Sequence, residues 1–140
     1  MNRRCFLLTG GALVALPSLA EATPDDVTRV LRAAIGNCVP QKGRVKLDIP
    51  VMVENGNSVT LTVSIDALPE DVTAIHIFAD GNPLPNVAHI RYGPSAGHPR
   101  LTTRMRLATS QTVSAVAEMT DGTCWIDEVT LLVTLAACIE

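Results

Sequence analysis

Hydrophobic and polar residues alternate with a period of two along most of the chain, the pattern of a β-strand with one buried and one exposed face. In residues 58–65, for example, valine, leucine and isoleucine alternate with serine and threonine. Further strand candidates are 45–49, 72–78, 87–92, 101–107, 112–119 and 129–135. Clusters of Asn, Asp, Gly and Pro separate these segments as turns. The pattern predicts a mainly β fold, an immunoglobulin-like antiparallel β-sandwich.

One segment near the N-terminus has a helical period instead. Thr23 can cap a helix, Pro24 suits its first turn, and the two aspartates that follow favour the positive end of the helix dipole. Apolar residues then form one stripe at helical spacing: Val27, Val30, Leu31, Ala34 and Ile35. The following Gly36 is typical of a helix end. We expect one short N-terminal helix that covers an edge or an end of the sandwich.

Residues 1–22 have the features of an export signal. The pair Arg3-Arg4 precedes an apolar stretch, and small residues allow cleavage after Ala20 or Ala22. The arginine pair followed by Phe and Leu resembles a twin-arginine signal. The alternative, an ordinary secretory signal, leads to the same compartment. We therefore expect a periplasmic protein.

The mature chain is expected to comprise a β-sandwich domain, 23–135, and a C-terminal arm, 136–140. Cleavage after Ala20 removes two of 11 basic residues and leaves 14 acidic ones, a net charge of −5. This acidity, with only 3% aromatic residues, argues against nucleic-acid binding. No apolar run after residue 22 is long enough to cross a bilayer.

The chain has four cysteines, and Cys5 leaves with the signal. Cys38 follows the predicted helix and Cys124 stands at a strand start, two places that a sandwich could bring together. A Cys38–Cys124 disulfide and two separate thiols therefore both stay open. Cys138 lies beyond the last predicted strand, where a thiol could enter the pocket of another protein. The alternatives are that residues 137–139 simply finish that strand, or that Cys138 is an incidental free thiol.

Residues that could ligate a metal or perform catalysis are scattered. A periplasmic copper site would have to draw on the three histidines and two methionines, which are His76, His89, His98, Met105 and Met119. No pair of them has the close spacing typical of a metal site, so we predict no metal and no cofactor. The acidic residues show no acid–base constellation, and we do not expect an enzyme.

Several segments, in this order and at this spacing, resemble the SoxY family. They are Gly43–Pro50, Glu54–Asn57, Ile77–Pro83, Thr103–Ala108, Thr112–Val113, Ala115–Met119, Asp121–Gly122 and Trp125. The resemblance spans about residues 24 to 138 and includes the twin-arginine signal.

The resemblance implies a function as well as a fold. A SoxY protein is the sulfur-carrier subunit of a bacterial thiosulfate-oxidising system and pairs with a second small β protein, SoxZ. A cysteine on its C-terminal arm carries the sulfur substrate between periplasmic enzymes. These include a haem enzyme that attaches thiosulfate and a hydrolase that releases sulfate. By this resemblance, Cys138 is the attachment point.

The arm departs from the family's Gly-Gly-Cys-Gly-Gly ending. It reads Ala136-Ala137-Cys138-Ile139-Glu140. Alanine and isoleucine restrict the backbone more than glycine does, and a carboxylate near the sulfur disfavours the thiolate. An alternative function is therefore a SoxY-like interaction module of another periplasmic oxidation system, without sulfur transfer.

Overall fold

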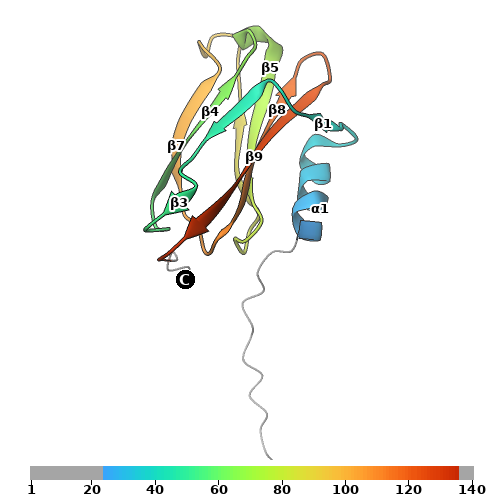
Figure 1. The fold of residues 1–140 in the computed structure, drawn as a ribbon. Helices are drawn as coiled ribbons and strands as arrows, with labels where there is room; N and C mark the ends of the chain where they lie inside the picture. Colours follow the sequence, from blue (N-terminus) through green and yellow to red (C-terminus); the bar gives the residue numbers. More distant parts are fainter. Residues whose placement is uncertain (1–23, 136–140) are drawn as a thin grey trace, which may run out of the picture.

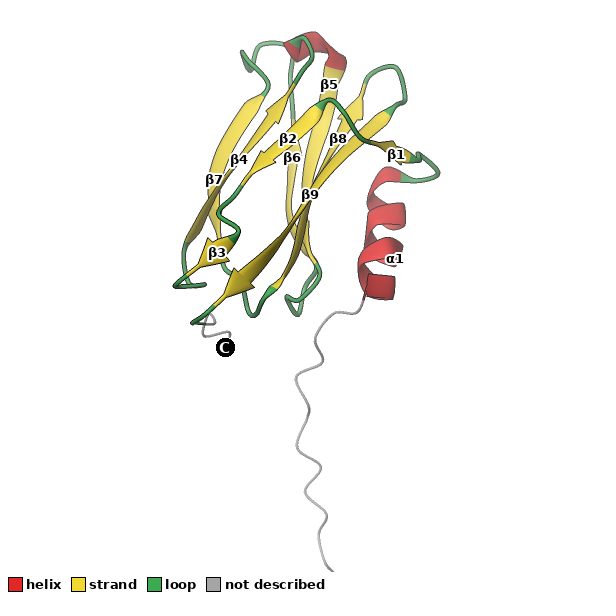
Figure 2. Ribbon diagram, in the orientation of Figure 1, coloured by secondary structure: helices red, strands yellow, loops and turns green. Residues whose placement is uncertain are grey.

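A computed structural model describes residues 24–135, which form two β-sheets and one α-helix (Figures 1 and 2). The elements are α1 (Pro24–Ile35), β1 (Pro40–Gln41), β2 (Val45–Asp48), β3 (Met52–Val53), β4 (Val59–Ile65), a 3₁₀ turn η1 (Pro69–Asp71), β5 (Val72–Ala79), β6 (Asn86–Arg91), β7 (Arg100–Met105), β8 (Gln111–Met119) and β9 (Cys124–Val133).

The two sheets pack face to face. The larger has the strand order β1-β9-β8-β5-β6, with β3 also pairing with β9, and the smaller has the order β2-β4-β7. All ladders between the longer strands are antiparallel. The mainly β, immunoglobulin-like sandwich is thereby confirmed. The two-residue strands β1 and β3 run parallel to β9 and were not predicted, because two residues are too short to show a period.

The apolar residues of the alternating pattern are the ones that lie in the interior of the sandwich. In β4, Leu61 and Val63 are 1% and 0% exposed, while Thr60 and Thr62 face outward. Ile75 and Ile77 of β5 approach the same core from the larger sheet, and both are 0% exposed. Burying aliphatic side chains from both sheets supplies most of the driving force for this fold.

The helix lies on a face of the fold rather than at an edge or end, which corrects the sequence prediction. Figure 1 shows α1 beside the larger sheet. The apolar stripe of α1 packs on the outer surface of that sheet, against Phe78, Val116 and Cys124. Both faces of β5 and β8 are consequently buried in their central parts. The helix ends at Gly36, which has φ +68° and donates its N–H to the Arg32 carbonyl.

The last strand begins at Cys124, which the sequence placed at a strand start, and this is five residues before the apolar pattern of the strand candidate 129–135. Asp127 and Glu128 interrupt the apolar pattern between these two positions. In the structure, Cys124 already pairs with Glu118 of β8. The Asp127 carboxylate fits the strand because its Oδ2 accepts a hydrogen bond of 2.8 Å from the backbone N–H of Leu47.

Candidate functional site

The end of β9 precedes, along the chain, the segment that carries the predicted attachment cysteine. Leu135 is held at both backbone polar groups: its N–H donates to the Glu54 carbonyl at 3.1 Å, and its carbonyl accepts from the Gly56 N–H at 2.8 Å. Cys138 and its predicted neighbours lie outside the described residues, as do the export signal and Thr23. What the structure shows is that Leu135, the last described residue, is held by two backbone hydrogen bonds.

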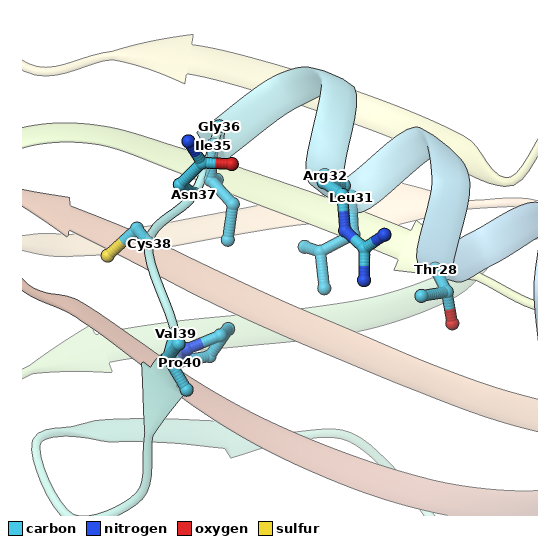
Figure 3. Close-up of a pocket in the computed structure, with 9 residues that line it drawn as sticks. All are labelled: Thr28, Leu31, Arg32, Ile35, Gly36, Asn37, Cys38, Val39 and Pro40. Atoms are coloured by element: carbon cyan, nitrogen blue, oxygen red, sulfur yellow. The ribbon is translucent and has the colours of Figure 1, made fainter.

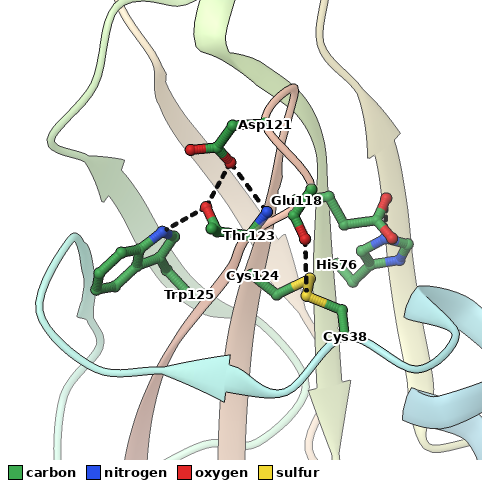
Figure 4. Close-up of a disulfide and its surroundings, with 8 residues drawn as sticks. Cys38, His76, Glu118, Asp121, Thr123, Cys124 and Trp125 are labelled. Atoms are coloured by element: carbon green, nitrogen blue, oxygen red, sulfur yellow. Dashed lines mark hydrogen bonds and ion pairs between the residues drawn. A yellow bond between two sulfur atoms is a disulfide. The ribbon is translucent and has the colours of Figure 1, made fainter.

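The structure joins Cys38 and Cys124 in a disulfide, the pairing that the sequence left open (Figure 4). Their Cα atoms are 6.1 Å apart, and 86 positions separate them along the chain. Cys124 is 3% exposed and belongs to the cluster beneath α1. Because Cys38 follows the helix directly, the bond ties the C-terminal end of α1 to the start of β9.

Local hydrogen bonds hold the tight turn that precedes Cys124. Asp121 accepts hydrogen bonds on Oδ1 from the backbone N–H of Thr123 at 2.9 Å and from its hydroxyl at 2.6 Å (Figure 4). These bonds from Thr123 stabilise the carboxylate and lower the pKa of Asp121. The indole N–H of Trp125 in turn donates to the Thr123 hydroxyl at 3.2 Å. The residues on both sides of Cys124 are thus held by local contacts.

A histidine is buried on the outer face of the larger sheet. His76 of β5 is 1% exposed, and its ring stacks on that of His89 in β6 with 4.4 Å between the ring centroids. Its Nε2 lies 3.4 Å from Oε2 of Glu118, yet neither ring nitrogen has a hydrogen bond within the described residues (Figure 4). Burial lowers the pKa of His76 below 6.5; Glu118 opposes this shift and His89 adds to it.

This buried imidazole makes the stability of the fold depend on pH. The unfolded chain binds a proton at His76 below pH 6.5, whereas the folded chain resists it. The contribution of His76 to the free energy of unfolding should therefore be fully present above pH 6.5. It should be lost as the pH drops toward the lowered pKa. One proton limits the contribution of this residue to about 1.4 kcal/mol per pH unit.

The measurement is chemical unfolding between about pH 5 and 7.5. His76→Phe should flatten the profile, because it removes the titrating group from a site that already stacks on aromatic rings. His98→Gln is the matched control, since it removes a histidine whose side chain is exposed. An unaltered slope in His76→Phe would contradict the argument.

The residues considered for a copper site do not gather. His76 and His89 come together, but their rings stack in near-parallel planes, so their in-plane lone pairs do not converge on one point. His98 is in an exposed loop, and Met105 and Met119 are buried in the sandwich core. Within residues 24–135, no group of three His, Cys, Asp or Glu side chains could hold a metal ion.

A pocket of about 420 Å³ lies where the chain leaves α1 (Figure 3). Leu31 and Ile35 of the helix and Val39 and Pro40 of the following segment supply apolar walls. The rest of the lining is Thr28, Arg32, Gly36, Asn37 and Cys38. Sequence reasoning missed this pocket, although its lining comes from residues 28–40 alone, because the pattern does not show the path of the chain after the helix. It missed the stack of the two strand histidines because that stack depends on how two separate strands pair.

Comparison with protein families identifies the chain. The family model described as "Sulfur oxidation protein SoxY" matches residues 31–138. The chain belongs to the SoxY family. The match covers most of the sandwich and extends to Cys138, so the SoxY resemblance found in the sequence is confirmed. As a family member, the protein is a sulfur-oxidation protein. No curated protein is a significant match to the chain.

Several solved structures have a similar fold. A superoxide reductase (neelaredoxin) of Ignicoccus hospitalis is 16% identical, with TM-score 0.54, over 81% of this chain and 94% of its own. The superoxide reductase of Nanoarchaeum equitans is 14% identical, with TM-score 0.51, over 67% and 99%. The hypothetical protein PH1083 of Pyrococcus horikoshii is 15% identical, with TM-score 0.52, over 66% and 95%. At these identities, the SoxY-family chain shares their fold, which carries no conclusion about activity.

The part of this SoxY-family chain that the structure describes contains no helix long and apolar enough to cross a membrane. The α1 helix has 12 residues, and its polar side faces solvent. About 20 apolar residues would be needed for a helical span.

Proposed function

We propose that this SoxY-family protein is a periplasmic carrier that holds sulfur intermediates covalently on Cys138 and does not itself catalyse their conversion. The observation that supports the proposal most is that the family match includes Cys138. The disulfide adds a second argument: of the three cysteines after residue 22, Cys138 is the one outside the Cys38–Cys124 bond. An adduct can be attached to its sulfur without breaking the Cys38–Cys124 disulfide.

The proposed chemistry needs only a thiolate on the carrier. Thiosulfate and the Cys138 thiolate form a sulfur–sulfur bond and give up two electrons, which a partner haem enzyme accepts. The product is Cys138–S–S–SO₃⁻. A partner hydrolase then adds water to release sulfate and two protons, leaving a persulfide anion on Cys138. Covalent attachment keeps each intermediate from diffusing away between these enzymes.

The carrier is proposed to work as a heterodimer with a SoxZ-like subunit. β6 and β7 are edge strands of the two sheets, and an edge strand presents unpaired backbone groups that a second β protein can cover. Co-expression with a SoxZ-like protein should give one complex of the summed size on gel filtration. Separate elution of the two chains would remove this part of the proposal.

The attachment site is tested by intact-mass measurement on protein from cells oxidising thiosulfate. The wild-type protein should carry a sulfur adduct that maps to the peptide containing Cys138 and is removed by a reducing agent. Cys138→Ala should carry none, while its disulfide stays intact. An adduct that persists in Cys138→Ala would refute the site. A wild-type protein that never carries one, yet still binds its partners, would favour the interaction-module alternative.

A further inference from the structure

Exposed large apolar side chains gather at one end of the sandwich. The described residues include seven such side chains, and five of them are at the end where β9 finishes: Val51, Met52, Leu84, Leu132 and Leu135. The remaining two, Val39 and Leu68, are at the opposite end. Contiguous exposed apolar surface is uncommon on soluble proteins and is typical of interaction sites.

Backbone pairing brings four of these residues together at the end of β9. Met52 of β3 is the register partner of Leu132 in β9, so the two side chains project on the same side; they are 65% and 51% exposed. The carbonyl of Val51 accepts a hydrogen bond from the Leu132 N–H at 2.8 Å, and Leu135 follows on the same strand end. We call Val51, Met52, Leu132 and Leu135 the apolar end surface.

The apolar end surface continues into a concave region. A pocket of about 600 Å³ is bordered by Val51 and Leu132. The hydroxyls of Thr112 and Thr130 lie 2.9 Å apart in its wall, and one donates a hydrogen bond to the other. An apolar side chain inserted here by a partner would leave that bond in place.

The position of Cys138 in the chain requires its enzymes to approach this end. It lies three positions after Leu135, which is anchored by the Glu54 and Gly56 backbone. An extended chain advances at most about 3.6 Å per residue, so the two Cα atoms are at most about 11 Å apart. An enzyme that brings its reactive atoms to Cys138 therefore comes close to the surface around Leu135.

We propose that the apolar end surface is the docking site of the enzyme that loads Cys138, whose active-site entrance carries a complementary apolar rim. The inference rests on the proposed carrier function. Burial of these side chains would supply the affinity, and the short distance to Cys138 would place the sulfur at the entrance in the same step. The occupant is the loading enzyme rather than the SoxZ-like subunit.

The test is steady-state loading of the carrier, co-expressed with its SoxZ-like subunit, by the haem enzyme of the same system with thiosulfate as substrate. Met52→Ser, Leu132→Ser and the double variant are compared with wild type. Leu68→Ser is the matched control, because Leu68 is 59% exposed at the opposite end. The double variant should raise the KM for the carrier by about tenfold or more with little change in kcat. Leu68→Ser should stay within about twofold of wild type.

Three further results separate the ways in which the proposal could fail. The rate at which iodoacetamide alkylates Cys138 should be equal in all variants, which shows that the thiol itself is intact. A wild-type KM in the double variant overturns the docking site while leaving the carrier function standing. Loss of the SoxZ-like subunit from the double variant on gel filtration also overturns it, because the surface would then be a subunit interface. A reactive wild-type protein that the enzyme does not load removes the carrier function and this inference together.

Discussion

Replacing both Cys38 and Cys124 by serine should lower the free energy of unfolding by about 4 kcal/mol. The bond joins residues 86 positions apart, and the entropy that a cross-link removes from the unfolded chain grows with the length of its loop. A domain of this size is stable by only about 5 to 15 kcal/mol, so the loss is a large fraction of the total. The α1 end should also lose its covalent tie to β9.

The measurement is urea unfolding of the mature protein, with Cys138→Ser in every variant so that no free thiol exchanges with the disulfide. The single change Cys138→Ser is the control and should keep the unfolding midpoint of the oxidised wild type. Alkylation with counting by mass should find no free cysteine in the Cys138→Ser protein before reduction and two after it. A loss below about 1 kcal/mol, or two alkylated cysteines before reduction, would contradict the prediction.

Phe78→Ala should cost about 3 to 5 kcal/mol, the usual range for removing a large buried aromatic side chain. Phe78 is 1% exposed on the outer face of β5, where it packs in one cluster with Ile35 of α1, Val116 of β8 and Cys124. Its ring centroid also lies 6.1 Å from that of His76. Deleting the ring leaves a cavity beneath α1 that the covalently tied helix cannot close completely.

Three comparisons distinguish this effect from general destabilisation. Phe78→Leu keeps most of the apolar volume and should cost clearly less than Phe78→Ala. Leu84→Ala removes an apolar side chain that is 79% exposed and should change the stability by less than about 0.5 kcal/mol. Amide hydrogen exchange in α1 should accelerate in Phe78→Ala more than exchange in β4, which lies in the other sheet. Equal stability of Phe78→Ala and wild type would show that the helix does not depend on this contact.

The sequence was sufficient for the strands because alternation with a period of two directly reports which side chains are buried. Residues 58–65 carry such a pattern and form β4 almost as predicted. It was not sufficient at Asp127, where a carboxylate inside a strand is compensated by the N–H of Leu47, 80 positions away. A local pattern contains no information about a partner at that distance.

Some features of the candidate site were likewise predicted from the sequence, and others appeared only in the structure. The family resemblance and the position of Cys138 beyond the last predicted strand came from the sequence, and the family match now supports the first of these. The Cys38–Cys124 pairing was open until the turn at Asp121 and the end of α1 were seen to meet. The His76–His89 stack and the apolar end surface had no sequence signal, since each joins residues of separate strands.

By itself, the sequence determined that this chain forms one helix and a β-sandwich and that it belongs with sulfur-oxidation proteins, because periodicity and ordered motifs are local properties of the chain. Only the tertiary structure decided that α1 covers the outer face of the larger sheet. The apolar stripe of a helix shows that it must be buried but not against which surface. Strand register decided that Met52 lies beside Leu132 and His76 beside His89, since register sets which side chains of distant segments are neighbours.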